Sequence, residues 1–109
     1  MAWAVKLFTN PRGDSPVKIF LDKLDHSTHA KSIKMIELLQ IHGPGLPPPY
    51  SKKLISGVYE LRTSGQVASR ILYTSHLGTF YLLHAFKKKT NKTPTNELQV
   101  AIDRKSKLI

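Results

Sequence analysis

The sequence predicts a single α+β domain: a mainly antiparallel sheet of about four strands, two amino-terminal helices packed on one face, and a helix at the carboxyl end. Three observations lead to this class. The chain has 109 residues, the usual size of one domain. Apolar residues recur with the helical period in its first half, whereas its second half holds three strand-like segments joined by short connections. Residues 1–109 are therefore expected to form one domain.

The amino-terminal half opens with a short strand over residues 4–8 (AVKLF) and continues with two helices. Ser15 is a good N-cap and Pro16 suits the first helical position. The helical spacing i, i+3, i+4, i+7 is met by Val17, Phe20, Leu21 and Leu24. A second helix is expected from near Ser27 to residues 43–44. Its apolar residues wrap most of the cylinder, so it is either covered on two sides or exposes a partner-binding surface.

The second half begins with a stiff loop over residues 43–50 (GPGLPPPY), because proline and glycine interrupt regular structure there. Three strands are then expected over residues 54–62, 67–74 and 79–86, with a hairpin turn at residues 64–66. Short connections indicate an antiparallel meander, which the amino-terminal strand can join. Thr93 is expected to cap the last helix, with Pro94 at its first position.

The composition is strongly basic, with 17 Lys and Arg against 7 Asp and Glu and a formal net charge of +10. Such a field attracts polyanions, so nucleic acid is the expected partner, and no membrane association is expected because the basic run is not an amphipathic helix. The absence of cysteine excludes disulfides, thiolate nucleophiles and cysteine zinc sites. We expect a cytoplasmic protein with neither a membrane span nor a leader segment.

Two arginines on neighbouring strands are the first candidate site residues. Alternation places Glu60 and Arg62 on one face of their strand, opposite Tyr59 and Leu61, and it leaves Arg70 on the same surface as Arg62. Two guanidinium groups on one surface form a plausible phosphate clamp. The alternative is that Arg62 simply pairs with Glu60 on an exposed face.

The strand over residues 79–86 and the basic run after it supply the other candidates. His84 is expected to share a face with Phe80, Leu82 and Phe86, either as a core histidine bonded to the backbone or as a catalyst. The basic run is Lys87, Lys88, Lys89 and Lys92. Repulsion among its ammonium groups favours a neutral lysine, the form that a general base requires. Lys52 and Lys53 are further candidates for binding RNA phosphates.

The carboxylates show no metal-ligand spacing, and the sequence contains no His-x-x-x-His motif and no glycine-rich phosphate loop. A divalent-metal nuclease and a nucleotide hydrolase are therefore disfavoured, and no metal or small-molecule cofactor is expected. If the protein cuts RNA, the ribose 2′-OH would attack the adjacent phosphate. A lysine or His84 would take the proton, while arginine and lysine would stabilise the developing charge.

Several segments together resemble a known family. PVKIFLDKL (residues 16–24), GVYELR (57–62), RILY (70–73) and LLHAFKKKTNKTP (82–94) resemble, in order and spacing, the phage-derived HigB-like branch of the RelE/ParE toxin superfamily. The resemblance implies a RelE-like fold and the toxin of a type II toxin-antitoxin pair. It also implies ribosome-dependent endonuclease action on mRNA, and a cognate antitoxin that is often a helix-turn-helix DNA-binding protein.

The resemblance also implies a set of site residues. On these motifs the catalytic candidates are Arg62, Arg70, His84, Lys88 and Lys89, and Lys87 and Lys92 are candidates for RNA and phosphate binding, as are Lys52 and Lys53 outside the motifs. One departure concerns the proton donor, because RelE-type proteins combine arginine with a tyrosine at the carboxyl end. No tyrosine follows Tyr81 in this chain.

Two other functions stay open at this point. A ParE-like toxin that poisons DNA gyrase would need a protein-binding helix surface, for which the apolar residues 33–41 are suited. A non-catalytic phage protein would use the same positive sheet only to contact phosphates. The basic composition is compatible with all three functions.

Overall fold

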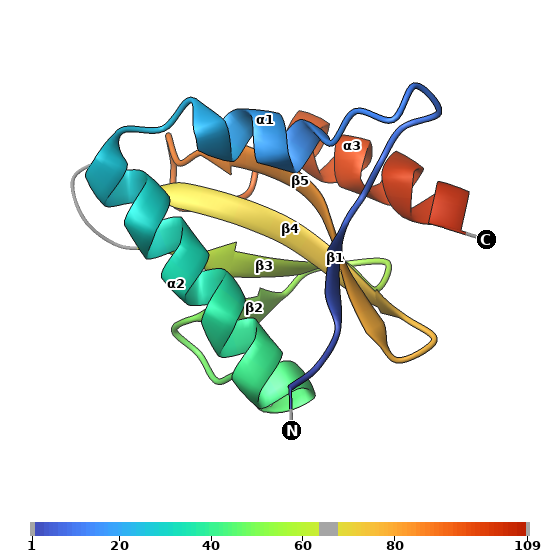
Figure 1. Ribbon diagram of the computed structural model, residues 1–109, viewed down its shortest axis with the longest axis horizontal. Helices are drawn as coiled ribbons and strands as arrows, with labels where there is room; N and C mark the ends of the chain where they lie inside the picture. The colour runs from blue at the N-terminus through green and yellow to red at the C-terminus, as the bar shows by residue number, and fades with distance from the viewer. Residues whose placement is uncertain (1, 64–67, 109) are drawn as a thin grey trace.

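The computed structural model describes residues 2–63 and 68–108, which form one mixed sheet with helices on both faces (Figure 1). The strands are β1 (Val5–Leu7), β2 (Ser51–Lys53), β3 (Tyr59–Arg62), β4 (Ser69–His76) and β5 (Thr79–Lys87). The helices are α1 (Pro16–Asp22), α2 (His26–His42) and α3 (Thr95–Lys105), with short 3₁₀ turns at Gly43–Gly45 and Ser106–Leu108. None of the helices in these ranges is long and apolar enough to cross a membrane.

The sheet has five strands in the order β1-β5-β4-β3-β2, so the prediction of about four strands is wrong. The additional strand is β2, which pairs antiparallel with β3. Residues 54–58, expected to be strand, form the turn between them, and Ser56 and Gly57 both have positive φ there. The turn is closed by two backbone hydrogen bonds: the nitrogen of Leu54 donates to the carbonyl of Val58, and the nitrogen of Val58 donates to the carbonyl of Ile55. The predicted turn at residues 64–66 and the strand start at Val67 lie outside the described residues.

The amino-terminal strand joins the sheet as expected, but β1 runs parallel to β5, with Val5 opposite Phe80 and Leu7 opposite Leu82. The chain leaves β1, passes through both helices to the far edge of the sheet, and returns through the antiparallel strands β2 to β5. Because β5 closes this meander beside β1, the two strands far apart in sequence are neighbours in the sheet. The meander itself was predicted correctly.

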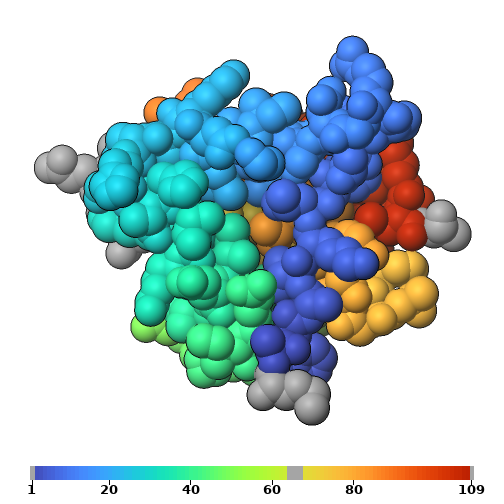
Figure 2. Space-filling model, in the orientation of Figure 1, coloured from blue at the N-terminus to red at the C-terminus, as the bar shows by residue number. Residues whose placement is uncertain are grey.

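A separate apolar core lies on each face of the sheet. On one face α1 and α2 pack over Leu61, Ile71, Tyr73, Phe80 and Leu82. On the other face α3 packs through Ala101 on Val58, Leu72, Leu83 and Phe86. The space-filling view in Figure 2 shows the first face, where α1, α2 and β1 hide most of the sheet. The alternation along β3 therefore divides its side chains between the α1–α2 face and the α3 face.

Helix α2 is buried along one stripe only, so covering on two sides is not observed. Its buried residues are Thr28, Ser32, Met35 and Leu39, spaced three or four apart. Ile33 and Ile41 remain exposed. The partner-binding interpretation of this exposed apolar surface stays open.

The helix starts follow local capping chemistry in two cases and tertiary contacts in the third. Ser15 caps α1 by accepting from the backbone nitrogen of Lys18, with Pro16 first in the helix, as predicted. Helix α2 begins at His26, close to Ser27 as predicted, and Asp25 caps it by accepting from the backbone nitrogen of Thr28. The prediction that Thr93 caps α3 is wrong by one residue, because Pro94 takes the cap position and the hydroxyl of Thr93 bonds elsewhere.

Candidate functional site

Glu60 is a buried carboxylate on the α3 face of the sheet, and three side chains converge on it. It is 2% exposed. Its Oε1 accepts a hydrogen bond from Nε of Arg62 at 2.9 Å and lies 3.8 Å from Nε of Arg70. Its Oε2 accepts from the hydroxyl of Thr93 at 2.6 Å. We call Glu60, Arg62, Arg70 and Thr93 the arginine site.

The two arginines meet because Arg62 and Arg70 are directly opposite each other on β3 and β4. The expected shared surface is therefore present, and so is the expected alternative, since Arg62 does pair with Glu60. The two interpretations do not compete. Two guanidinium charges face one carboxylate, so the arginine site keeps a net positive charge while Glu60 holds it in place.

The two arginines differ in what they offer to a ligand. Arg70 is buried, and its Nη1 donates to the carbonyls of Thr63 and Ser69 at 2.9 and 3.0 Å. Burial lowers the pKa of Arg70, the charge of Glu60 opposes this, and the charge of Arg62 lowers it further. The Arg62 side chain is 28% exposed. Arg62 is thus the arginine that a ligand can reach, and the buried Arg70 adds its positive charge beside it.

The lysine-bearing connection between β5 and α3 is anchored at both ends, to the chain just before β4 at one end and to the arginine site at the other. The backbone nitrogen of Lys88 donates to the carbonyl of Ala68 at 2.9 Å, next to β4. At the other end, Thr93 holds the connection to Glu60. Between these anchors the lysines Lys88, Lys89 and Lys92 are all exposed. Several positive charges are therefore carried by a short segment fixed beside the two arginines.

The remaining lysine candidates are divided between the two faces of the sheet. Lys52 lies opposite Glu60 in the β2–β3 pairing and so shares the arginine face. Lys53 lies opposite Tyr59 and lines a cavity on the other face. Lys87 lies opposite Ser69, whose hydroxyl contacts α2. The structure therefore does not bring Lys53 and Lys87 to the arginine site.

A β-bulge decides the position of His84. Leu72 is opposite His84 and the next residue, Tyr73, is opposite Leu82, which leaves Leu83 as an extra residue in β5. The extra residue turns His84 onto the α3 face with Phe86. The prediction that His84 shares a face with Phe80 and Leu82 is therefore wrong.

His84 is held between two side chains of α3. Its Nε2 lies 2.8 Å from Oε1 of Glu97, and its Nδ1 lies 3.2 Å from Nη1 of Arg104. Because a guanidinium only donates, Nδ1 is the acceptor and the hydrogen sits on Nε2 toward Glu97. The side chain is 16% exposed. His84 also lies two strands from Glu60 in the same row, about 10 Å away at the usual strand spacing.

Three residues of this face were not singled out for function in the sequence. Glu60 was considered only as a surface partner, although its i, i+2 spacing from Arg62 was the available signal. Thr93 was interpreted only as a cap. Arg104 donates to the carbonyl of Leu83 at 2.9 Å and lies 5.8 Å above the ring of Phe8, and burial lowers its pKa. No local signal predicts the contacts of Thr93 and Arg104, because they depend on how α3 packs.

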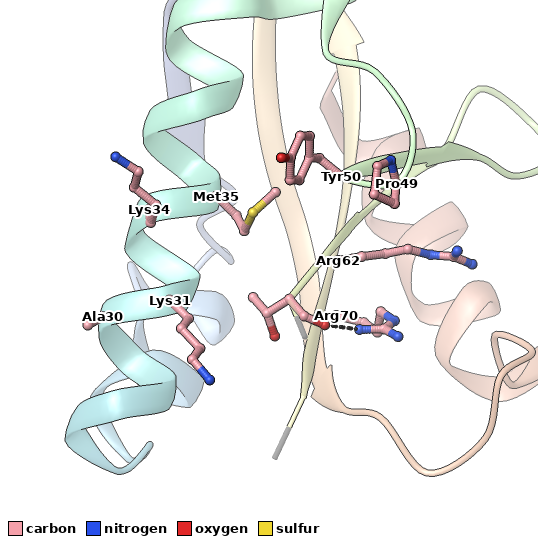
Figure 3. Close-up of a pocket in the computed structure, with 9 residues that line it drawn as sticks. Ala30, Lys31, Lys34, Met35, Pro49, Tyr50, Arg62 and Arg70 are labelled. Atoms are coloured by element: carbon pink, nitrogen blue, oxygen red, sulfur yellow. Dashed lines mark hydrogen bonds between the residues drawn. The ribbon is translucent and has the colours of Figure 1, made fainter. Parts of the chain in front are cut away.

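A cavity of about 570 Å³ adjoins the arginine site on the α2 side (Figure 3). Arg62, Thr63 and Arg70 form one wall of the cavity, and α2 forms the opposite wall. Figure 3 shows the guanidinium groups of both arginines pointing away from α2. Their aliphatic parts line the cavity while their charged ends lie in the arginine site. Within the described ranges, no group of three or more His, Asp or Glu residues has an arrangement that could hold a metal ion.

A known family accounts for most of the chain. The family model described as phage derived protein Gp49-like (DUF891) matches residues 19–106, which includes the whole arginine site. No curated protein matches the chain. The family is associated with RelE-like and other toxin-like proteins. Because the match extends from α1 to the end of α3, this protein belongs to the phage-derived Gp49-like family.

Proposed function

We propose that this protein is the toxin of a type II toxin-antitoxin pair of the HigB-like kind, and that it cleaves mRNA on the ribosome without a metal ion. The observation that carries the proposal is the arginine site, in which a buried carboxylate fixes a solvent-facing Arg62 and a lysine-bearing connection on one face of the sheet. The association of the family with toxin-like proteins supports it. A helix-turn-helix antitoxin, encoded by a neighbouring gene, would neutralise the toxin.

In the proposed reaction, Arg62 holds the scissile phosphate and the ribose 2′ oxygen attacks the phosphorus. The O2′–P bond forms as the P–O5′ bond breaks, which leaves a 2′,3′-cyclic phosphate and a 5′-hydroxyl end. Arg62 and Arg70 stabilise the charge of the phosphorane, at which positioned donors act most strongly. Lys52 and Lys92 would contact flanking phosphates.

The proton transfers are assigned to Lys88 and Lys89. One of the two lysines accepts the proton of the 2′-OH, and the other gives a proton to the leaving O5′. The geometry favours lysine over His84, because Nδ1 of His84 already accepts from Arg104 and α3 covers the ring. His84 is better suited to holding α3 on the sheet.

The test is to induce expression in bacteria, map RNA 5′ ends, and repeat the cleavage with purified translating ribosomes. We expect 5′-hydroxyl ends within translated messages only. Arg62→Ala should lower the cleavage rate about 100-fold or more, the usual loss when one oxyanion donor is removed. Arg12→Ala is the matched control, because Arg12 is an exposed arginine in the β1–α1 connection. Equal cleavage by the Arg62 variant, or equal cutting of untranslated RNA, would refute the proposal.

A gyrase-poisoning toxin is the second candidate, and the exposed Ile33 and Ile41 of α2 are the observation that favours it. In that case expression would arrest growth with gyrase-dependent DNA breaks and intact RNA. Ile33→Ser would then relieve the arrest, whereas Arg62→Ala would not.

A further inference from the structure

The cavity beside the arginine site has apolar walls and a positive rim. Its lining residues are Ala30, Lys31, Lys34, Met35, Pro49, Tyr50, Arg62, Thr63 and Arg70. Four of the nine are cationic and none is acidic. Such a cavity favours a ligand with a flat apolar body and a negative group attached to it.

Tyr50 and Met35 make the cavity suitable for a nucleobase. In Figure 3 the side chain of Met35 points from α2 toward the ring of Tyr50 across the cavity. The Tyr50 ring belongs to a residue that is 43% exposed, so part of it is accessible to a ligand. Its backbone is fixed, since its nitrogen donates to the carbonyl of Pro47 and its carbonyl accepts from the nitrogen of Arg62, both at 3.0 Å. Unpaired bases stack on aromatic rings held in this way.

The same arginines connect the cavity to the arginine site. The aliphatic parts of Arg62 and Arg70 line the cavity, and their guanidinium groups point away from α2 and lie beside Glu60. A base in the cavity therefore lies next to a phosphate bound by Arg62. A peptide ligand would not use this combination of an accessible ring and a neighbouring phosphate clamp.

We propose that the cavity between α2 and Tyr50 binds one unpaired base of a single-stranded RNA whose adjoining phosphate is held by Arg62. The inference rests on the proposed function for the identity of the ligand as RNA. The base stacks on Tyr50 and contacts the methyl group of Met35, and Lys31 at the rim faces the RNA backbone. The cavity thus fixes the register of the strand relative to Arg62.

The experiment uses Met35 as the reporter, because Met35 lines the cavity and the chain has one other methionine, Met1. The full chain, labelled with ¹³C at the methionine methyls, is titrated with a 2′-O-methylated RNA hexanucleotide that cannot be cleaved. A Met35→Leu variant assigns the two signals. We expect the Met35 signal to shift as the RNA binds.

Variants then test the stacking. Tyr50→Ala should weaken RNA binding by about fivefold to 100-fold, the range for loss of one stacked base. Tyr50→Phe keeps the ring and should bind within about twofold of the parent chain. Ile55→Ala is the control, since Ile55 is an exposed apolar residue close in sequence that does not line the cavity. An RNA with abasic sites throughout should leave the Met35 signal unmoved.

The inference would be overturned by an unmoved Met35 signal with the intact RNA, by equal shifts with the abasic RNA, or by unchanged affinity of the Tyr50→Ala variant. A shift caused only by an amphipathic Glu/Leu peptide would overturn it in favour of a peptide site. The assay contains no ribosome and no cleavage, so its outcome is separate from that of the proposed function. Cleavage of translated messages without RNA binding in the cavity refutes this inference alone, and base-dependent binding without cleavage refutes the proposed function alone.

Discussion

Replacing Glu60 by glutamine removes the only negative charge of the arginine site and keeps the shape of the side chain. The amide oxygen can still accept from Nε of Arg62, and the amide nitrogen can donate to the hydroxyl of Thr93. What is lost is the charge that strengthens both bonds. Hydrogen bonds to charged groups contribute about 1.5–3 kcal/mol and neutral ones about 0.5–1.5 kcal/mol, so the bond to Thr93, which becomes neutral, loses about 1 kcal/mol. The bond to Arg62 keeps the charge of the guanidinium but loses its ion pair, a further loss of about 1 kcal/mol.

Two such bonds give an expected loss of about 2 kcal/mol in the free energy of unfolding. In a domain of this size that corresponds to a decrease of about 10 °C in Tm. Urea denaturation at pH 7, followed by circular dichroism, measures the free energy directly. Glu37→Gln is the matched control, because Glu37 is exposed on α2 and its replacement should change the free energy by less than about 0.5 kcal/mol. If both variants lose the same small amount, the arginine site is not organised by Glu60.

Three further predictions concern other parts of the fold. The pKa of Asp25 is lowered mainly by hydrogen bonds from Thr28, so its carboxylate stabilises the fold above pH 3.8 and loses this effect below it. Asp25→Ala should therefore destabilise the fold at pH 6, and the difference from the parent chain should shrink as the pH falls below 3.8. Acid unfolding of the parent chain and of the variant measures this difference. Burial raises the pKa of Tyr73 above 10.0, so the contribution of its protonated hydroxyl to the free energy of unfolding is lost as the pH rises above that value. An absorbance titration of the tyrosines should show one group that ionises at higher pH than the others, and Tyr73→Phe should remove it. If this high-pH ionisation remains in the variant, the assignment to Tyr73 is wrong. Gly43 has a φ of 54°, and a Cβ added there would lie 2.5 Å from the indole of Trp3. Gly43→Ala should therefore lower the free energy of unfolding by about 1–3 kcal/mol, as measured by urea denaturation. An unchanged free energy of unfolding would show that Gly43 and Trp3 are not in contact.

The site was predicted in part because its strongest signals are local. Arg62 and Arg70 were placed on one surface from alternation alone, since side chains of a strand point to alternate faces. The same rule failed for His84, because one extra residue in β5 reverses the alternation beyond it. No sequence feature marks that extra residue as a bulge.

The role of Glu60 was missed for a different reason. A Glu two residues before an Arg is common on an exposed strand, where such a pair contributes little. Here Glu60 is buried, and its second oxygen is bound by Thr93, more than thirty residues later in the chain. Because the hydroxyl of Thr93 bonds to Glu60, it does not cap α3, and Pro94 takes the cap position instead. The Thr93–Glu60 contact thus explains both the missed site residue and the wrong cap.

The sequence by itself determined the α+β class, the start of α1, the antiparallel meander and the positive character of the protein, because capping, periodicity and net charge are properties of neighbouring residues or of composition. Only the tertiary structure decided which candidates share a site. It placed Lys53 and Lys87 on the opposite face from Arg62, enclosed His84 under α3, and brought Thr93 to Glu60. These positions depend on strand register, on a bulge and on the packing of a distant helix, which are set by the burial of both faces of the sheet at once.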